Sequence, residues 1–200
     1  MPHAAFPDVF LTPRLRAERM RQSHLSFITQ MHANADVMAT MGGTRDAAAS
    51  RLYLAQNVAH WLDHGYGMYV LQTREHGALA GRAGLKFTLT DEGGAIELAY
   101  AFEPDCWGRG YAVEIATALV GLGFRLLPVD TLCAVAIRSN AASRRVLEKI
   151  GMRLLGDVEA AADNANAKPD SDTKVRYEIH RRQWRDQQDV ADANTALPSR

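Results

Sequence analysis

The chain has 200 residues, which is enough for one well-buried core, and its 23 lysines and arginines balance 23 aspartates and glutamates. A zero net charge argues against a nucleic-acid partner, because nucleic-acid binders normally carry a basic surface. Two cysteines and scattered histidines offer no disulfide framework and no metal-ligand spacing, and no apolar run reaches the length of a membrane span. We therefore expect a single cytoplasmic domain without a metal and without membrane contact.

The N-terminal region predicts one strand and one helix. Residues 1–9 look like a loose lead-in, and alternation from Leu11 predicts a strand that ends near Met20. Ser23 is the predicted N-cap of a helix that reaches about Asn34.

The next region predicts a second helix and a series of antiparallel strands. The helix begins after Thr44 or Asp46 and ends at His64-Gly65, where the glycine suits the residue after a helix. Turn signals at residues 74–77 and 91–94 separate the strand-like runs. These runs are 66–73, 79–89 and 96–102.

The run at 96–102 predicts a strand with two different faces. One face carries the bulky residues Ile96, Leu98, Tyr100 and Phe102, and the other carries Glu97, Ala99 and Ala101. The small face leaves room for a ligand, although small side chains also suit ordinary packing under a helix. Pro104 ends the strand because it has no N–H for a sheet ladder.

A glycine-containing loop and a helix follow this strand. Helical spacing predicts a helix from near Gly110 to Arg125. The loop glycines let the backbone bend, and the first N–H groups of a helix lack internal partners and lie at the positive end of its dipole. Such a junction suits phosphate, but a Gly-x-Gly alone favours a bare turn equally.

The C-terminal region predicts a strand, a short helix and two last strands. The strand spans 130–137, and the helix follows Asn140 and ends before Gly151. The last strands are at 153–158 and 173–180, and the acidic segment between them is long for a hairpin connection. Beyond Trp184 we expect a disordered polar tail.

The loop resembles motif A of the GCN5-related N-acetyltransferases (GNAT family), whose pattern is Gln/Arg-x-x-Gly-x-Gly/Ala. Trp107 departs from the usual first residue, but Trp-Gly-Arg-Gly-Tyr-Ala resembles the branch that contains the ribosomal-protein serine and alanine N-terminal acetyltransferases. Leu-Thr-Pro-Arg-Leu at 11–15 resembles the opening of that branch. The resemblance implies an α/β (α+β) fold over residues 9–185, with flexible tails at 1–8 and 186–200. Its mixed, mostly antiparallel sheet would have about seven strands and about four flanking helices.

The resemblance also implies acetyl-CoA as co-substrate and a set of residues that hold it. Backbone amides of the loop would bind its pyrophosphate; the loop consists of Trp107, Gly108, Arg109, Gly110, Tyr111 and Ala112. Backbone N–H groups at Tyr100, Ala101 and Phe102, where the strand would splay from its neighbour, would polarise the acyl carbonyl and pair with the pantetheine arm. Asn140 would contact that arm, and Arg144 or Arg145 could meet the 3′-phosphate, although exposed arginines are equally solvated surface charges.

Two residues match the catalytic positions that the resemblance implies. Glu97 resembles the glutamate that accepts the amine proton, directly or through a water, and its alternative is an exposed strand carboxylate. Ser143, in Asn140-x-x-Ser143, resembles the residue near the sulfur that assists the leaving thiolate, and the alternative is a simple helix start with Asn140 as N-cap. Many family members use a tyrosine there, and this helix has none. The expected mechanism is direct transfer in a ternary complex, without an acyl-enzyme.

The acceptor is a primary amine that the sequence leaves open. The acidic segment at 157–172 would favour a cationic acceptor, or it is a solvated loop. An α-amine, with a pKa of roughly 8, is neutral far more often near neutral pH than a lysine at roughly 10.4, which favours a protein N-terminus or a small-molecule amine. Related enzymes are monomers or homodimers. The competing readings are a non-catalytic acyl-CoA-binding module and a generic nucleotide-phosphate binder.

Overall fold

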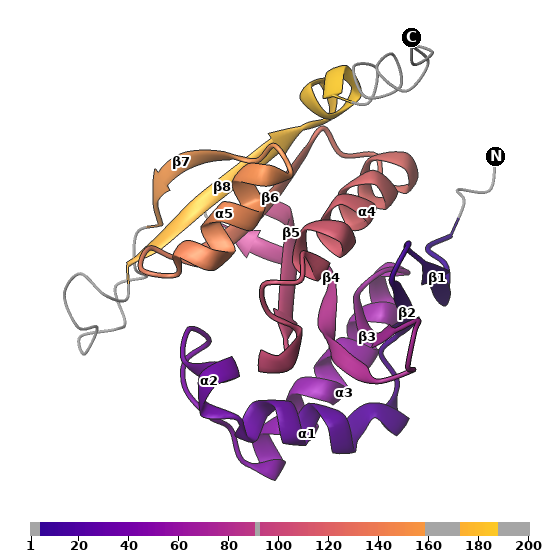
Figure 1. Ribbon diagram of the computed structural model, residues 1–200. Helices are drawn as coiled ribbons and strands as arrows, with labels where there is room; N and C mark the ends of the chain where they lie inside the picture. Colours follow the sequence, from indigo (N-terminus) through magenta and orange to yellow (C-terminus); the bar gives the residue numbers. More distant parts are fainter. Residues whose placement is uncertain (1–4, 91–92, 159–172, 188–200) are drawn as a thin grey trace, which may run out of the picture.

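A computed structural model describes residues 5–90, 93–158 and 173–187, in which eight strands form one sheet with helices on both faces (Figure 1). The strands are β1 (Val9–Leu11), β2 (Leu15–Arg19), β3 (Met68–Thr73), β4 (Leu79–Thr90), β5 (Gly93–Phe102), β6 (Thr131–Ile137), β7 (Arg153–Asp157) and β8 (Lys174–His180). Their order in the sheet is β1-β2-β3-β4-β5-β6-β8-β7, and only β5 and β6 run parallel.

The helices are α1 (Leu25–Ala33), α2 (Ala35–Met38), α3 (Ala47–His64), α4 (Tyr111–Leu126) and α5 (Ala141–Lys149), with the 3₁₀ turns η1 (Gln22–His24) and η2 (Pro104–Cys106). The chain is also helical at 181–187, past the expected end of ordered structure at Trp184. None of the helices in the described ranges is long and apolar enough to cross a membrane. The mixed, mostly antiparallel architecture that the sequence predicts is confirmed.

The sheet has eight strands instead of about seven because the first predicted strand is divided. Pro13 lies in a tight reversal between β1 and β2, which pair antiparallel. Thr12 stabilises the reversal, since its N–H donates to the Leu15 carbonyl at 2.9 Å and its hydroxyl accepts from the Leu15 N–H at 3.1 Å. Phe6, inside the expected lead-in, is buried, and its ring lies 5.6 Å from that of Tyr66.

Most predicted helix ends are confirmed, and one is wrong. Asp46 caps α3 by accepting from the Ala49 N–H at 2.7 Å, and Gly65 ends it in the left-handed region. Ser23 is not an N-cap, because it lies inside η1, where the Arg21 N–H donates to Nδ1 of His24 instead. Of the predicted turn at 91–94, residues 91 and 92 lie outside the described ranges, while Gly93 and Gly94 already belong to β5.

Two hydrophobic clusters hold the helices against the sheet. The larger cluster joins α4 and α5 to the strands through side chains such as Leu98, Leu119 and Phe124. The smaller cluster joins α1 and α3 to the opposite face and includes Met31 and Leu54. Full burial of one such side chain is worth about 1.5–3 kcal/mol, so these contacts fix the helices on either side of β5.

The contact between β5 and β6 is short, and this opens the sheet. Their parallel pairing is limited to Glu97 opposite Cys133. β5 nevertheless continues to pair with β4 up to Phe102. The C-terminal half of β5 therefore presents a backbone edge that no other described strand covers, which is the splay that the family resemblance implies.

Candidate functional site

The loop before α4 has the geometry of an anion cradle. Gly108 and Gly110 adopt left-handed φ angles of +71° and +78°, which side chains disfavour. Within the described ranges, the N–H groups of residues 108–113 donate to no other group, and the Glu114 N–H makes the first bond of the helix, to the Gly110 carbonyl at 3.1 Å. A run of unpaired N–H groups at a helix start attracts an anion such as phosphate.

The first turn of α4 is fixed by residues from the N-terminal strands. Glu114 accepts from the Thr12 hydroxyl at 2.6 Å and from the Arg14 N–H at 2.7 Å, and Nε of Arg14 lies 2.6 Å from its other oxygen. Arg14 also donates to the Arg109 carbonyl at 2.8 Å. Burial alone would raise the pKa of Glu114, but these hydrogen bonds outweigh it and lower that pKa. The motif at 11–15 thus holds the loop in place.

Trp107 links the loop to the free edge of β5. Its indole N–H donates to the Phe102 carbonyl at 2.8 Å, while about half of its surface, 52 %, stays exposed. The predicted pyrophosphate loop and the predicted carbonyl-binding strand therefore meet at one place.

Tyr100 crosses the opening between β5 and α5. Its hydroxyl lies 3.1 Å from the Ser143 carbonyl oxygen and 3.0 Å from Oγ of the same residue. Burial raises the pKa of Tyr100 to about 12, so its hydroxyl is neutral near pH 7. The sequence predicts only a backbone role for Tyr100, and it misses the contact of this side chain with Ser143.

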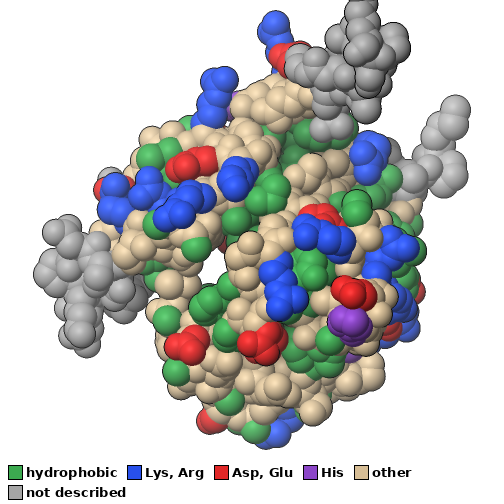
Figure 2. All heavy atoms as spheres, viewed as in Figure 1, with side chains coloured by type: hydrophobic (Ala, Val, Ile, Leu, Met, Phe, Trp, Pro, Cys, Tyr) green, Lys and Arg blue, Asp and Glu red, His purple; other side chains and the backbone are tan. Residues whose placement is uncertain are grey.

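Asn140 has the N-cap role that the sequence offered as the alternative. Its side-chain oxygen accepts from the Ser143 N–H at 3.0 Å, and its amide donates to the Thr40 hydroxyl at 3.0 Å. Thr40 follows α2, so this contact connects the part of the molecule with α5 to the part with α2. Figure 2 shows the surface hollowed between these two parts.

Glu97 faces the opposite side of β5 from Tyr100. It lies half-buried, opposite Lys86 in β4, and its Oε2 accepts from the Thr88 hydroxyl at 3.3 Å. Glu97 and Ser143 thus lie on different faces of the sheet. Glu97 is also the β5 residue that pairs with Cys133 of β6, and the opening between the two strands follows it.

The small face of β5 is less open than the sequence suggests. Ala101 is buried, with 7 % of its surface exposed, in the cluster that α1 and α3 form, and Ala99 packs against that cluster. Of the two alternatives that the sequence left open, ordinary packing under the helices therefore explains Ala101.

Other predicted cationic and acidic side chains differ in their surroundings. Arg109 and Arg145 are exposed, whereas Nε of Arg144 donates to the Tyr177 hydroxyl at 3.0 Å. Asp157 pairs with Arg138, and the acidic positions at 159–172 lie outside the described ranges. Among the described residues, no group of His, Cys, Asp and Glu could hold a metal ion.

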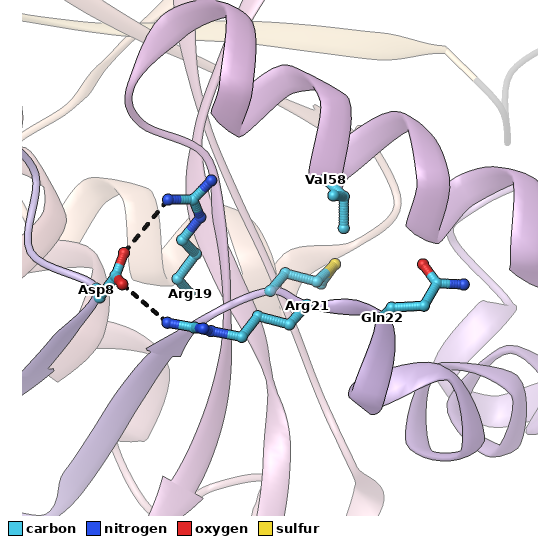
Figure 3. Close-up of a pocket in the computed structure, with 6 residues that line it drawn as sticks. Asp8, Arg19, Arg21, Gln22 and Val58 are labelled. Carbon is cyan, nitrogen blue, oxygen red and sulfur yellow. Dashed lines mark hydrogen bonds and ion pairs between the residues drawn. The ribbon is translucent and has the colours of Figure 1, made fainter.

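A surface depression lies away from this site, between β2, η1 and α3 (Figure 3). It has a volume of about 360 Å³, and its lining includes Asp8, Arg19 and Arg21. Asp8 already pairs with both arginines, at 3.4 and 2.8 Å, as the dashed lines show. Asp8 is thus shared by two arginines, and these ion pairs occupy the charged groups that line the depression.

Most of the chain matches the model of one known domain family. The family model described as "Acetyltransferase (GNAT) domain" matches residues 14–153. The uncharacterized protein YkkB of Bacillus subtilis is 27% identical over 143 residues, which cover 71% of this chain and 83% of YkkB. The uncharacterized N-acetyltransferase YnaD of Bacillus subtilis is 37% identical over 60 residues, which cover 30% of this chain and 35% of YnaD.

Solved structures share the fold at low sequence identity. An acetyltransferase from Agrobacterium tumefaciens str. C58 superposes with a TM-score of 0.71 at 24% identity, covering 90% of this chain and 98% of that one. RimL, a ribosomal L7/L12 alpha-N-protein acetyltransferase in complex with coenzyme A, gives 0.70 at 15% identity, covering 88% and 98%. The aminoglycoside acetyltransferase AAC(6')-Ib in complex with coenzyme A gives 0.69 at 18% identity, covering 87% and 99%.

Proposed function

We propose that this chain, which belongs to the GNAT acetyltransferase family, transfers an acetyl group from acetyl-CoA to a primary amine. The transfer is direct and takes place in a ternary complex. The observation that carries this proposal is the single paired position between β5 and β6, which lies beside a loop whose N–H groups are unpaired. An extended thioester fits an open strand edge, and its phosphates fit a helix start.

Acetyl-CoA binding would use three parts of the site. The amides of the loop at 107–112 would hold the pyrophosphate, and the edge of β5 at 100–102 would pair with the pantetheine arm. Asn140 would contact the same arm with the second hydrogen of its amide. Figure 2 shows Lys and Arg side chains gathered over α5, and the residues of this helix among them are Arg144, Arg145 and Lys149. Their positive charge suits a further phosphate.

In the transfer step, the amine nitrogen bonds to the acetyl carbon as the C–S bond breaks. Glu97 would take the amine proton, directly or through a water, and N–H groups at 100–102 would stabilise the negative charge on the carbonyl oxygen. Because a thiol is acidic, with a pKa of about 8.5 for a cysteine side chain, the sulfur leaves as a thiolate and takes up a proton afterwards. Ser143, positioned by Tyr100, would donate a hydrogen bond to it.

The acceptor class follows less directly. The loop at 107–112 and the motif at 11–15 resemble the branch that acetylates the N-termini of ribosomal proteins, and this resemblance favours a protein N-terminus as acceptor. The likeness to RimL agrees with this choice. An equal likeness to AAC(6')-Ib keeps a small-molecule amine as the second candidate. A non-catalytic acyl-CoA-binding module is the alternative function, and the contacts of Glu97 with Thr88 and Lys86 on β4 are the observation that favours it, because they would also suit a carboxylate with a structural role.

Release of free CoA thiol tests the proposal. The purified protein would be given acetyl-CoA with polyamines, amino acids, aminoglycosides and short peptides that begin with Ser, Ala or Met. We expect release with one acceptor class and its loss in Glu97→Gln. Tight acetyl-CoA binding without release for any acceptor would instead support the binding module.

A further inference from the structure

A cationic cluster lies on the face of the sheet that carries Glu97. In the antiparallel pairing of β4 with β5, Arg82 is opposite Ala101 and Lys86 is opposite Glu97. Side chains of directly opposed residues stand on the same face. Arg82 therefore shares the face of the predicted base, beside the segment of β5 predicted to bind the acyl carbonyl.

Arg82 is a buried charge without a counter-charge. Only 7 % of the residue is exposed. Its Nη1 donates to the Tyr53 hydroxyl at 2.6 Å, and its Nη2 lies 3.4 Å from the sulfur of Met41. Its Nε is buried with no hydrogen-bond partner, and no carboxylate in the described ranges forms an ion pair with it. A buried guanidinium without a counter-charge is costly, which points to an anion that supplies one.

A second arginine adds to this charge. Arg45 lies 5.6 Å from the centre of the Tyr53 ring, and the Arg82 guanidinium lies 4.8 Å from it. Arg45 donates to the Met41 carbonyl at 3.5 Å, and no ion pair joins it to any carboxylate that the structure describes. The two guanidinium groups thus gather around one tyrosine and one methionine.

The groups around them do not neutralise the charge. Burial lowers the pKa of Lys86, and Arg82 and Arg45 lower it further while Glu97 opposes them. Burial and the same arginines lower the pKa of His32 to about 4, so that imidazole is neutral near pH 7. Three cations therefore face a single carboxylate, Glu97, which already lies opposite Lys86.

Glu103 is the other acidic residue close in sequence to this part of β5. It forms no ion pair with Arg82 in the described structure, and burial beside Asp105 raises the pKa of Glu103. It therefore does not serve as the missing counter-charge.

We propose that Arg82 and Arg45, with the Tyr53 hydroxyl, bind a carboxylate of the acceptor, so that the substrate is an amine that also carries a carboxylate. This inference rests on the proposed acetyl transfer for the role of the bound molecule. A guanidinium fork matches a carboxylate with two parallel hydrogen bonds. Arg82 is opposite Ala101, four residues or about 13 Å along β5 from Glu97, so we infer an acceptor held by the ends of the long Glu97 and Arg82 side chains and not against the packed alanines. This preference is opposite to the one suggested by the acidic segment at 157–172.

The test compares acceptors that differ only in that carboxylate. The peptides Ser-Asp and Ser-Asn, both amidated at the C-terminus, have similar α-amines and test a side-chain carboxylate. The dipeptide Ser-Ala against its C-terminal amide tests a main-chain carboxylate that is remote from the α-amine. We expect the preferred acid to have a kcat/KM at least tenfold above its amide. Arg82→Gln should raise KM for the acid at least tenfold and leave acetyl-CoA affinity within twofold. Arg51→Gln, an exposed arginine on α3, is the matched control and should change neither.

Two further measurements keep the outcome decisive. Arg45→Gln, at a half-buried position, replaces Arg82→Gln if the latter does not fold. Without acetyl-CoA, the acid but not the amide should raise the melting temperature of the unaltered chain, and this rise should vanish in the arginine variant. If that shift appears without turnover, the anion site stands and acetyl transfer falls. Equal use of acid and amide, or a preference that survives in both arginine variants, overturns the inference.

Discussion

The hydroxyl oxygen of Tyr100 lies 3.0 Å from Oγ of Ser143, although 43 positions separate the two residues in the chain. This contact joins β5 to α5 where β5 has lost its pairing with β6. It places a neutral phenol beside the serine proposed to assist the leaving thiolate. We therefore propose that Tyr100 positions Ser143.

Removing that hydroxyl should lower turnover more than it changes cofactor binding. We expect Tyr100→Phe to reduce kcat by about tenfold, the cost of about 1.4 kcal/mol for one lost hydrogen bond in the transition state, with KM for acetyl-CoA within about threefold. Because the two hydroxyls act together, the double variant with Ser143→Ala should be no slower than Ser143→Ala alone. Steady-state kinetics of the three variants checks this, and additive losses would show that Tyr100 acts independently.

The loop glycines should control acetyl-CoA affinity. Gly108→Ala places a side chain in a left-handed conformation at a cost of about 1–2 kcal/mol and brings a methyl group into the predicted phosphate cradle. We expect acetyl-CoA affinity to fall at least tenfold by calorimetry. Gly77→Ala has the same left-handed φ but lies in the hairpin turn between β3 and β4, so it should lower stability and leave affinity unchanged. Equal affinity in both variants would argue against the cradle.

Glu114 should stabilise the fold at neutral pH and not in acid. Its pKa is lowered in the folded state, so its contribution is complete above the unfolded carboxyl pKa of about 4.3 and is lost as the pH falls through the folded value. The free energy of unfolding of Glu114→Gln should therefore be about 1–3 kcal/mol lower than that of the unaltered chain at pH 7, and this difference should shrink progressively below pH 4.5. Denaturation series at several pH values measure this difference. The exposed Asp63→Asn on α3 is the control, and a deficit that stays constant with pH would contradict the explanation.

Much of the fold could be predicted because its signals are local. The loop glycines, the cap at Asp46 and the alternation around Glu97 each depend on a few neighbouring residues, and all appear where the sequence predicts them. The division of the first strand follows from Pro13, which has no N–H for a sheet ladder and lies in the reversal between β1 and β2. The additional helix α2 is only one turn long, so its sequence is too short to show a helical periodicity.

The parts of the site that the sequence did not predict depend on contacts between distant segments. Tyr100 reaches Ser143 only because β6 diverges from β5, which no periodicity encodes. Arg82 looks like an ordinary polar residue of a strand until α3 and the segment after α2 enclose it. Arg82 is opposite Ala101, and this register puts its side chain on the face of the sheet that α1 and α3 cover.

The mass of the acceptor after incubation with acetyl-CoA tests acetyl transfer most directly. With a suitable amine we expect the acceptor to gain one acetyl group as one CoA thiol is released. Glu97→Gln should slow both by about 10²–10⁴-fold while acetyl-CoA binding is preserved, because a positioned base contributes to the rate in that range. Glu97→Asp, which keeps a base, should be intermediate. Acceptors of unchanged mass despite bound acetyl-CoA, or a Glu97→Gln variant as fast as the unaltered chain, would contradict the proposed chemistry.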